Sequence, residues 1–429
     1  MSKLNLLYRQ LFVAILALYI YLGKGIAYSY FAEALLIMGL LLVIKNRNTL
    51  PVITSKAAIV LYIFLGINLV YIIKGMVGHS IIDTLRDGFV LNYIIFAFLV
   101  LLFFENLPHF FAALVKIYKY YPIVILSLFL LSQNNFLGSI SLFGGYHLLF
   151  FKFGDICVHL FISFIFQLVG LSNYKKPFDL LNYILTILMF SIATSYSRGG
   201  MLAFFIGFAI FYIFIKDAKI KQELKRFVKY LPIVIIVSVI FLINFSVDEN
   251  FQGRKVGIDQ VANNFTSVFS DSDEEGLNDN KVWRLLWWSQ IVDYTFNGPY
   301  FLTGKGLGMS LASDDDIITT DLDAELRSPH NFSLTILARY GVPIFLMWIF
   351  WLFLQFKRLK LVTLSKLQLV LISIQAAFLF NATFDVFLEG PMGAFPFWIF
   401  VGIDLALEFF KIYGSEVEQT IFTQAKSTI

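Results

Sequence analysis

Long apolar stretches separated by short polar segments run along almost the whole chain. Twelve of them approach the roughly 20 consecutive apolar residues that an α-helix needs to cross a bilayer. The pattern therefore predicts an all-α, polytopic membrane protein of about 12 transmembrane helices. The predicted spans are residues 11–27, 29–45, 57–73, 88–104, 120–137, 153–171, 178–196, 200–215, 230–246, 331–354, 367–384 and 393–411.

The composition leads to the same class and narrows the function. Of 429 residues, 59% are hydrophobic and only 14% are charged, which leaves too few polar side chains to cover a water-soluble domain. Soluble enzymes and nucleic-acid binders are therefore excluded, and membrane lipids are expected neighbours. A single cysteine, Cys157, excludes an intrachain disulfide and any metal site built on paired cysteines. We expect neither a metal nor another cofactor.

Charge predicts the orientation. An even number of spans places both termini on one side. The connection Val247–Arg327 carries 6 basic and 15 acidic residues, a net charge of −9, whereas the rest of the chain has a net charge of +13. Basic residues near short loops are retained in the cytoplasm, so the termini are predicted to be cytoplasmic and the acidic connection outside. The basic clusters on the side of the termini are Lys45, Arg47 and Lys56; Lys116 and Lys119; Lys216–Lys229; and Lys357–Lys366.

These predictions divide the chain into four parts. Residues 1–246 form spans one to nine, and residues 247–329 form a long outer loop region between spans nine and ten. Residues 330–411 form spans ten to twelve, and residues 412–429 form a cytoplasmic tail. A connection as long as the outer loop is usually functional or disordered.

Within the outer loop, two acidic stretches are predicted to be solvated and mobile: Ser270–Asn280 and Asp314–Asp316. The second lacks the glycine and the spacing of a calcium loop, which favours a solvated face over a cation site. Between them, apolar residues are interleaved with Lys281, Arg284 and Asp293 and are predicted to form a helix at the membrane surface; these apolar residues are Val282, Trp283, Leu286, Ile291 and Val292.

Few ionisable residues lie at the outer ends of the spans, and such groups at membrane depth are costly and usually functional. Arg198 lies in Ser-Tyr-Ser-Arg-Gly-Gly (195–200), a polar break where glycine allows close approach of a ligand. A guanidinium there can face a phosphate, although a lone arginine at a span end is otherwise a snorkelling anchor. Arg86 lies between Asp83 and Asp87, so a local ion pair and phosphate binding are equally open.

His330 lies in Arg-Ser-Pro-His-Asn (327–331), directly before the tenth span. Pro329 is expected to fix the start of that helix and to place the imidazole at a helix N-terminus, which disfavours its positive charge. A neutral imidazole suits a general base; a helix cap is the plainer alternative. Asp385 and Glu389, between spans eleven and twelve, either orient His330 or face water.

Two further groups carry open interpretations. Three tryptophans of the outer loop either stack on sugar rings or form an aromatic belt; these are Trp283, Trp287 and Trp288. Three polar residues near the sixth span are predicted to be satisfied groups inside the bundle; these are His147, Asp155 and His159.

Three motifs follow one another on the outer side. The first is Ser197-Arg198-Gly199-Gly200; the second is Arg284 followed by Trp287-Trp288 and Gly304-Lys305-Gly306-Leu307-Gly308; the third is His330-Asn331 with nine residues before Gly341. In this order they resemble the O-antigen ligase and polymerase superfamily, over roughly residues 195–346, and the twelve-span layout extends the resemblance to the whole chain. Ile344 stands where ligases often have Gly, Thr or Tyr, so the choice between ligase and polymerase stays open.

The resemblance implies a transferase at the periplasmic face of the bacterial inner membrane, acting in lipopolysaccharide or related surface polysaccharide synthesis. It would move a glycan from an undecaprenyl-pyrophosphate-linked donor to an acceptor hydroxyl, with inversion and without a metal. The acceptor would be lipid A core or another lipid-linked glycan. Arg198, Arg284 and Arg86 would bind the pyrophosphate, His330 would be the catalytic base, and Arg327 and Asn331 would adjoin them.

The rival function is a multi-span polysaccharide transporter or flippase. Such a protein is expected to carry broken helices or charged residues near the midplane of several spans. The candidate charges here gather at one face, beside the long loop, which favours chemistry at the outer surface over passage through the bundle.

Overall fold

The computed structural model describes residues 3–143, 146–172, 178–244, 260–261, 264, 275–317, 326–360, 364–412, 420 and 423. Within these residues the chain contains helices and no strand, which confirms the all-α prediction for this part. The helices are α1 (Lys3–Leu22), η1 (Gly23–Ile26), α2 (Phe31–Asn46), α3 (Lys56–Gly78), α4 (Ile81–Asn92), α5 (Ile95–Leu99), η2 (Val100–Asn106), α6 (Leu107–Ser132), α7 (Asn135–Gly138), α8 (Phe153–Leu168), α9 (Phe178–Tyr196), α10 (Arg198–Phe214), α11 (Ala218–Asn244), α13 (Glu275–Phe296), α14 (Leu311–Asp314), α15 (Phe332–Phe356), η4 (Lys357–Lys360), α16 (Lys366–Asn381), η5 (Phe387–Glu389) and α17 (Pro391–Ile412).

Every predicted span falls on a helix. Among the described residues, seven helical stretches are long and apolar enough to cross a membrane, and α8, α10 and α16 are shorter apolar helices. The chain is therefore consistent with a polytopic membrane protein, while twelve as the number of spans stays a prediction.

The fourth and fifth predicted spans are joined without a polar loop. Ile95–Ser132 forms one apolar helical stretch of 38 residues through α5, η2 and α6. The predicted start at residue 120 was wrong, because α6 begins at Leu107 with Pro108 in its first turn, where proline is well tolerated. The cluster Lys116 and Lys119, expected in a connection, consequently lies within α6.

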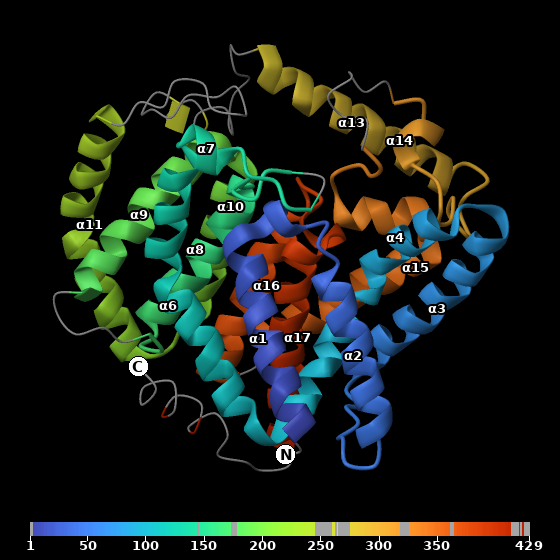
Figure 1. The fold of residues 1–429 in the computed structure, drawn as a ribbon, viewed down its shortest axis with the longest axis horizontal. Helices are drawn as coiled ribbons and strands as arrows, with labels where there is room; N and C mark the ends of the chain where they lie inside the picture. Colours follow the sequence, from blue (N-terminus) through green and yellow to red (C-terminus); the bar gives the residue numbers. More distant parts are fainter. Residues whose placement is uncertain are drawn as a thin grey trace.

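The centre of the bundle is formed by α17 (Figure 1). Of an 18-residue apolar stretch in α17, 89% is buried, whereas the corresponding share in α11 is 22%. α17 is therefore surrounded by protein, and α11 lies at the periphery. The ring of Phe395 in α17 lies 5.1 Å from that of Phe12 and 4.1 Å from that of Phe96. Each such aromatic pair contributes about 0.5–1.5 kcal/mol beyond its buried area, so stacked rings hold distant helices around α17.

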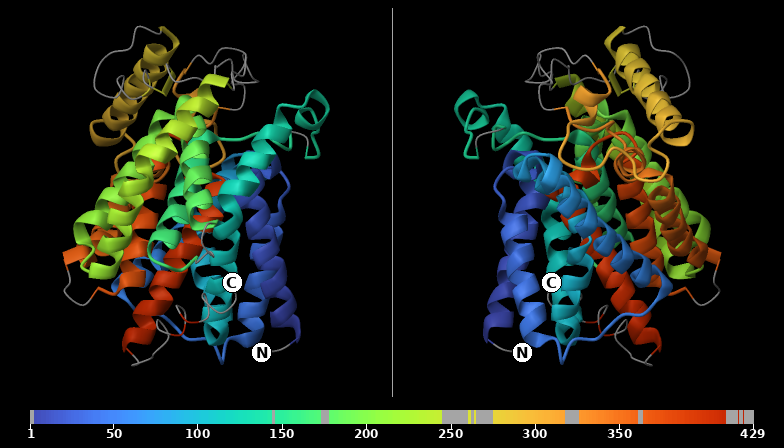
Figure 2. Two further views of the ribbon diagram at one scale, coloured as in Figure 1. Left: turned by 90° about the vertical axis from the view of Figure 1, so that its left-hand side faces the viewer. Right: turned by 90° about the vertical axis from the view of Figure 1, so that its right-hand side faces the viewer.

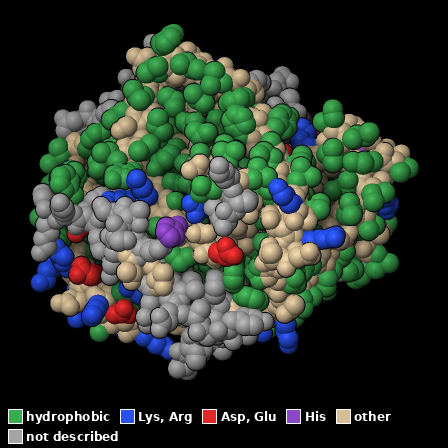
Figure 3. Space-filling model, turned by 60° about the horizontal axis from the view of Figure 1, so that its bottom comes forward, with side chains coloured by type: hydrophobic (Ala, Val, Ile, Leu, Met, Phe, Trp, Pro, Cys, Tyr) green, Lys and Arg blue, Asp and Glu red, His purple; other side chains and the backbone are tan. Residues whose placement is uncertain are grey.

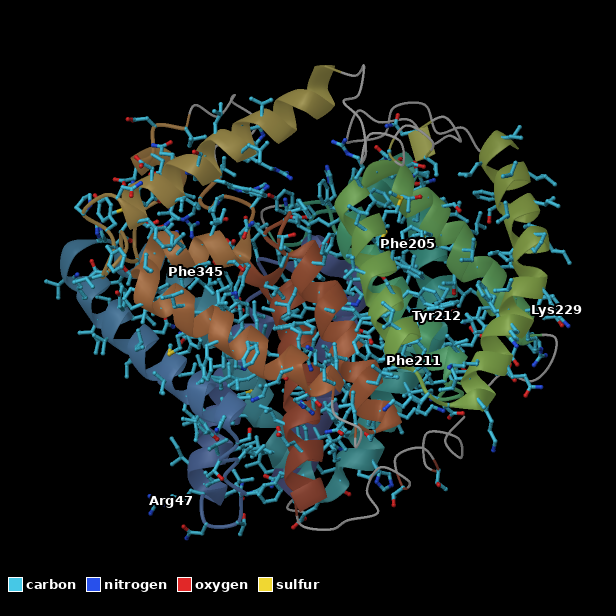
Figure 4. All side chains as sticks on the ribbon, turned by 180° about the vertical axis from the view of Figure 1, so that it is seen from behind. Arg47, Phe205, Phe211, Tyr212, Lys229 and Phe345 are labelled. Atoms are coloured by element: carbon cyan, nitrogen blue, oxygen red, sulfur yellow. The ribbon has the colours of Figure 1, made fainter. Side chains whose placement is uncertain are left out.

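The two ends of the bundle differ. α1 begins and α17 ends at one end, which we call the inner end, and α13 lies across the opposite, outer end (Figures 1 and 2). Arg47 also lies at the inner end (Figure 4). Hydrophobic side chains cover the flank, and charged side chains gather around the inner end (Figure 3). Both ends of the helical bundle thus lie on one side, as predicted, while the orientation in a membrane stays a prediction.

The outer loop is helical where it was expected to be, and beyond. α13 covers residues 282–292 and extends back to Glu275, into a stretch that was predicted to be mobile. Residues 270–274 of that stretch lie outside the described residues, as does most of the predicted tail 412–429.

Candidate functional site

Three segments that are far apart in the sequence meet at the outer end: the start of α10, the middle of α13 and the residues before α15. They converge on Phe384, in the connection between α16 and α17. Arg284 of α13 donates from Nη1 to the Phe384 carbonyl at 3.0 Å. At the start of α10, Gly199 packs on the same residue, because a Cβ there would lie 3.3 Å from Phe384 Cβ.

The start of α10 is set by Ser197 and two glycines. The Ser197 hydroxyl accepts from the Gly200 N–H at 3.1 Å and caps the helix. A Cβ on Gly200 would lie 2.5 Å from the Cα of Gly154 in α8, so only glycine allows these two helices to pack this closely. Arg198, the first residue of α10, is half-buried at this junction.

The start of α15 is capped by Asn331, whose Oδ1 accepts from the Leu334 N–H at 3.1 Å. The prediction that Pro329 places His330 at the helix N-terminus is therefore corrected: Asn331 holds that position, and His330 lies just outside the helix. His330 has φ +54°. A left-handed backbone at a residue other than glycine costs roughly 1–3 kcal/mol and clusters at functional sites, so the surroundings fix the direction of this imidazole.

Arg284 also reaches His330. Its Nη2 lies 3.4 Å from His330 Nδ1. A guanidinium only donates, so Nδ1 is the acceptor and the neutral imidazole carries its proton on Nε2. The neighbouring Trp288 donates from Nε1 to the Pro329 carbonyl at 2.8 Å, so α13 is held directly over the start of α15.

The imidazole of His330 is neutral at pH 7. Burial lowers its pKa to about 4; Asp385 raises this pKa, and Arg284, Lys152 and Lys24 lower it. The cause is thus burial and neighbouring cations rather than a helix dipole. Three cations against one carboxylate make the surroundings of His330 attractive to an anion.

Asp385 and Glu389 are partly exposed, and both contact other side chains. Asp385 forms an ion pair with Lys152. Burial alone would raise the pKa of Asp385, but the Lys152 ammonium and other neighbours lower it to about 2, so the carboxylate is ionised beside His330. Glu389 accepts from Thr335 Oγ1 at 2.8 Å and anchors the first turn of α15; burial raises its pKa.

Comparison with known families gives this geometry a context. Residues 183–349 match the family described as O-antigen ligase. This segment is similar to the O-antigen ligase family. The matched segment contains Arg198, Arg284 and His330, and it supports membership of the O-antigen ligase and polymerase superfamily, a role in glycosyl transfer in polysaccharide biosynthesis and a multi-pass bacterial membrane protein. No curated protein matches the chain.

The matched segment contains a break in α15 at Gly341, which has φ +79° and ψ 179°. The groups freed by the break are bonded to the segment that follows α13: Val342 N–H donates to the Phe301 carbonyl at 2.8 Å, and Lys305 N–H donates to the Ala338 carbonyl at 2.8 Å. Backbone hydrogen bonds therefore join the third motif, at Gly341, to the glycine-rich stretch of the second motif.

Arg86 and Arg327 lie in a separate ionic cluster. Arg327 lies 3.1 Å from Asp87 and 3.3 Å from Asp83. Arg86 pairs with Asp83 at 3.1 Å, and its side chain is 52% exposed. Among the described residues, no hydrogen bond or ion pair joins either arginine to the candidate site, and the local ion pair considered for Arg86 is observed.

Two charged residues with clear roles were missed by the sequence analysis. Arg339 is buried inside α15 and lies 2.9 Å from Asp87, and its position in an apolar helix near Gly341 was the available signal. Lys152 precedes α8 and pairs with Asp385, more than 230 positions away. No local pattern connects those two residues.

Trp287 and Asp315, both within the matched segment, are buried. Trp287 is fully buried and donates from Nε1 to Asp315 at 2.5 Å, so it cannot stack on a sugar. Asp315 is buried and paired with Lys305, which also contacts Asp314. The prediction of a solvated stretch is therefore wrong for Asp315, whose partners are Lys305 and Trp287, whereas Asp314 and Asp316 are exposed, as expected.

His159 and Asp155 are buried inside the bundle, as predicted, although Asp155 Oδ2 has no hydrogen-bond partner among the described residues; His147 instead is half-exposed in the connection before α8. His159 Nδ1 lies 3.1 Å from the Tyr118 hydroxyl, and Asp155 accepts from Asn381 Nδ2 at 3.1 Å. His147 Nδ1 lies 3.2 Å from the Ser139 carbonyl. In the part of the chain that the structure describes, no three His, Cys, Asp or Glu side chains gather as a metal site would require.

Proposed function

We propose that the outer end of the bundle transfers a glycan from an undecaprenyl-pyrophosphate-linked donor to an acceptor hydroxyl at the periplasmic face of the inner membrane. The observation that carries the proposal is the contact of Arg284 with His330. A single hydrogen bond joins residues from two separate family motifs. Arg284 is suited to binding phosphate, and His330 is suited to accepting a proton.

Arg284 and Arg198 bind the donor pyrophosphate in this proposal. A guanidinium binds phosphate oxygens through paired hydrogen bonds and stabilises the negative charge that develops on a leaving group. Arg284 reaches the Phe384 carbonyl from α13, and Arg198 begins α10, where the adjacent Gly199 packs on Phe384. Lys152, beside Asp385, adds positive charge to the same region.

His330 is the base that activates the acceptor. The acceptor oxygen forms a bond to the anomeric carbon, the bond from that carbon to the pyrophosphate oxygen breaks, and the hydroxyl proton passes to His330 Nδ1. Attack from the face opposite the leaving group inverts the anomeric centre. In the free protein Nδ1 accepts from Arg284, so donor binding must turn the guanidinium toward phosphate and release the lone pair for the acceptor.

The acceptor is either lipid A core, as in a ligase, or the growing end of another lipid-linked glycan, as in a polymerase. Trp283 and Trp288 are candidates to stack on its sugars, because they lie beside His330 and Phe384 with ring-centroid distances of 5.8 and 6.5 Å.

The pH dependence of kcat/KM tests the environment of His330. The base must be neutral, and kcat/KM reports the free protein, so activity should be level above about pH 5 and fall as the pH drops through the His330 pKa of about 4. Lys152→Met removes a cation that lowers this pKa, so the acid limb should move to higher pH. Asp385→Asn removes a carboxylate that raises it, so the limb should move lower. A wild-type limb near 6.5, the ordinary histidine value, would contradict this assignment.

Impermeant thiol labelling tests the orientation. In a background with the buried Cys157 replaced by serine, a cysteine at Asn297, at the end of α13, should react in intact spheroplasts. A cysteine at Gln222 in α11 should react only after the membrane is opened. The reverse pattern would place the candidate site in the cytoplasm and remove the proposed donor face.

A further inference from the structure

A second site lies at the inner end of the bundle. A cavity of ≈ 540 Å³ is enclosed by the end of α8 and the starts of α9, α11 and α16. This volume falls within the roughly 300–1,000 Å³ of small-molecule sites. α10 and α16 each have one end near this cavity and the other at the candidate functional site, so the two sites are separated by the length of these helices.

The cavity presents equal numbers of opposite charges. Its three cations are Lys219, Arg226 and Lys366, and its three carboxylates are Asp179, Asp217 and Glu223. A simple anion would face the carboxylates and a simple cation would face the ammonium and guanidinium groups, so a ligand that carries both charges is the best match.

The ion pairs within the cavity are loose. Arg226 lies 3.5 Å from Glu223 and Lys366 lies 3.9 Å from Asp217, and all four side chains are partly exposed. Pairs of this kind contribute only about 0–1 kcal/mol. A ligand can therefore replace them at little cost.

The wall of the cavity also holds an unused polar group. Ser172 is 1% exposed and lines the cavity, and its hydroxyl has no hydrogen-bond partner among the described residues. The nearby Gln167 is fixed by Asn182, at 2.7 Å, and by the Asp179 carbonyl, at 2.9 Å. A buried hydroxyl without a partner costs about 1–3 kcal/mol.

The position of α11 indicates a lipid. α11 is the most exposed of the long apolar helices, and its outward face is aliphatic, with Ile233 and Ile236 more than half exposed. The cavity is lined by the charged first half of α11, from Lys219 to Tyr230, which directly precedes this aliphatic face, and lipid headgroups lie next to such a charged flank of an apolar helix. Lys229 lies on the outward flank of the same helix (Figure 4).

We propose that this cavity binds the zwitterionic headgroup of a phospholipid, a phosphate joined to a primary ammonium, as in phosphatidylethanolamine. Arg226 donates to the phosphate, and the carboxylates accept from the ammonium, which offers three N–H donors. A quaternary ammonium has no such donors and needs an aromatic cage. The rings of Tyr183 and Phe227 in the wall pack on each other at 4.9 Å.

Lipid retention tests the proposal without reference to catalysis. The full chain is placed in nanodiscs of phosphatidylethanolamine with phosphatidylglycerol, or of phosphatidylcholine with phosphatidylglycerol, and retained lipids are counted by native mass spectrometry. We expect phosphatidylethanolamine to be retained about tenfold over phosphatidylcholine, the effect of one charge-assisted hydrogen bond. Equal retention, or a preference for phosphatidylglycerol, would overturn the proposal.

Variants locate the lipid, and a soluble headgroup identifies its source. Arg226→Gln and Glu223→Gln should each abolish the preference, whereas Lys229→Gln, on the same helix but outside the cavity, should keep it; a preference unchanged in Arg226→Gln would overturn the assignment.

Glycerophosphoethanolamine should fail to displace the lipid if acyl chains contribute. Displacement at equal concentration would show that the cavity takes the free headgroup and would overturn the lipid assignment. The wild-type comparison needs no variant, so it holds even if a variant fails to fold.

Discussion

Replacing His330 with alanine is expected to reduce glycan transfer about 10²- to 10⁴-fold, the usual contribution of a positioned base, while donor binding survives. The reason is geometric. His330 is held in a left-handed backbone conformation with Nδ1 facing Arg284, and burial keeps the ring neutral, with a pKa of about 4. Turnover and donor affinity, measured separately on purified protein, give the two quantities.

The matched control is His147→Ala, because His147 is a partly exposed histidine bonded to a backbone carbonyl outside the candidate site. It should retain near-normal turnover. Near-normal turnover in His330→Ala would reject the base role. Loss of donor affinity with little change in turnover would instead make His330 a pyrophosphate ligand.

Replacing Arg284 with lysine is expected to weaken donor binding about ten- to a hundredfold, because hydrogen bonds to a charged partner contribute about 1.5–3 kcal/mol. Lysine retains the positive charge but loses the paired N–H donors of the planar guanidinium group. Arg284 now reaches the Phe384 carbonyl at 3.0 Å and His330 at 3.4 Å with two different nitrogens, and one ammonium cannot reproduce that planar geometry. Arg198→Lys should act in the same direction.

Arg86→Lys is the control, since Arg86 is largely exposed on Asp83 and a surface pair of this kind contributes little. Donor affinity can be read from binding of a short-chain polyprenyl pyrophosphate to each purified variant. Unchanged affinity in both Arg284→Lys and Arg198→Lys would remove the two arginines from the pyrophosphate site. An equal loss in Arg86→Lys would extend that site to α4.

The apolar pattern was enough to place most of the helices, although the run 88–104 is divided among α4, α5 and η2 and the run 120–137 between α6 and α7. The pattern could not predict where individual helices begin or break. The start of α6 at Leu107 was missed since apolar residues continue through Pro108. The break at Gly341 was invisible as geometry, although the glycine itself was noticed, because the break depends on a loop that returns to bond Ala338 and Val342.

The candidate site was predictable where a motif carried it. Arg284 and His330 were selected from separate motifs, and the structure brings them into contact. The pairing of Lys152 with Asp385 could not be predicted, because those residues meet only through the packing of α8 against α16 and α17. Asp315 was misinterpreted for the same reason: the charge of the run was visible, but Lys305 and the buried Trp287 were not recognised as the partners of its central residue.

The central claim is that the outer end performs glycan transfer from a lipid pyrophosphate, and reconstitution tests it most directly. Purified protein in proteoliposomes receives a labelled undecaprenyl-pyrophosphate-linked glycan and an acceptor, in the presence of a metal chelator. We predict that each glycan joined to the acceptor releases one undecaprenyl pyrophosphate and that the new linkage has the inverted anomeric configuration. A donor that stays intact and instead appears on the opposite side of the bilayer would contradict the account and establish a flippase.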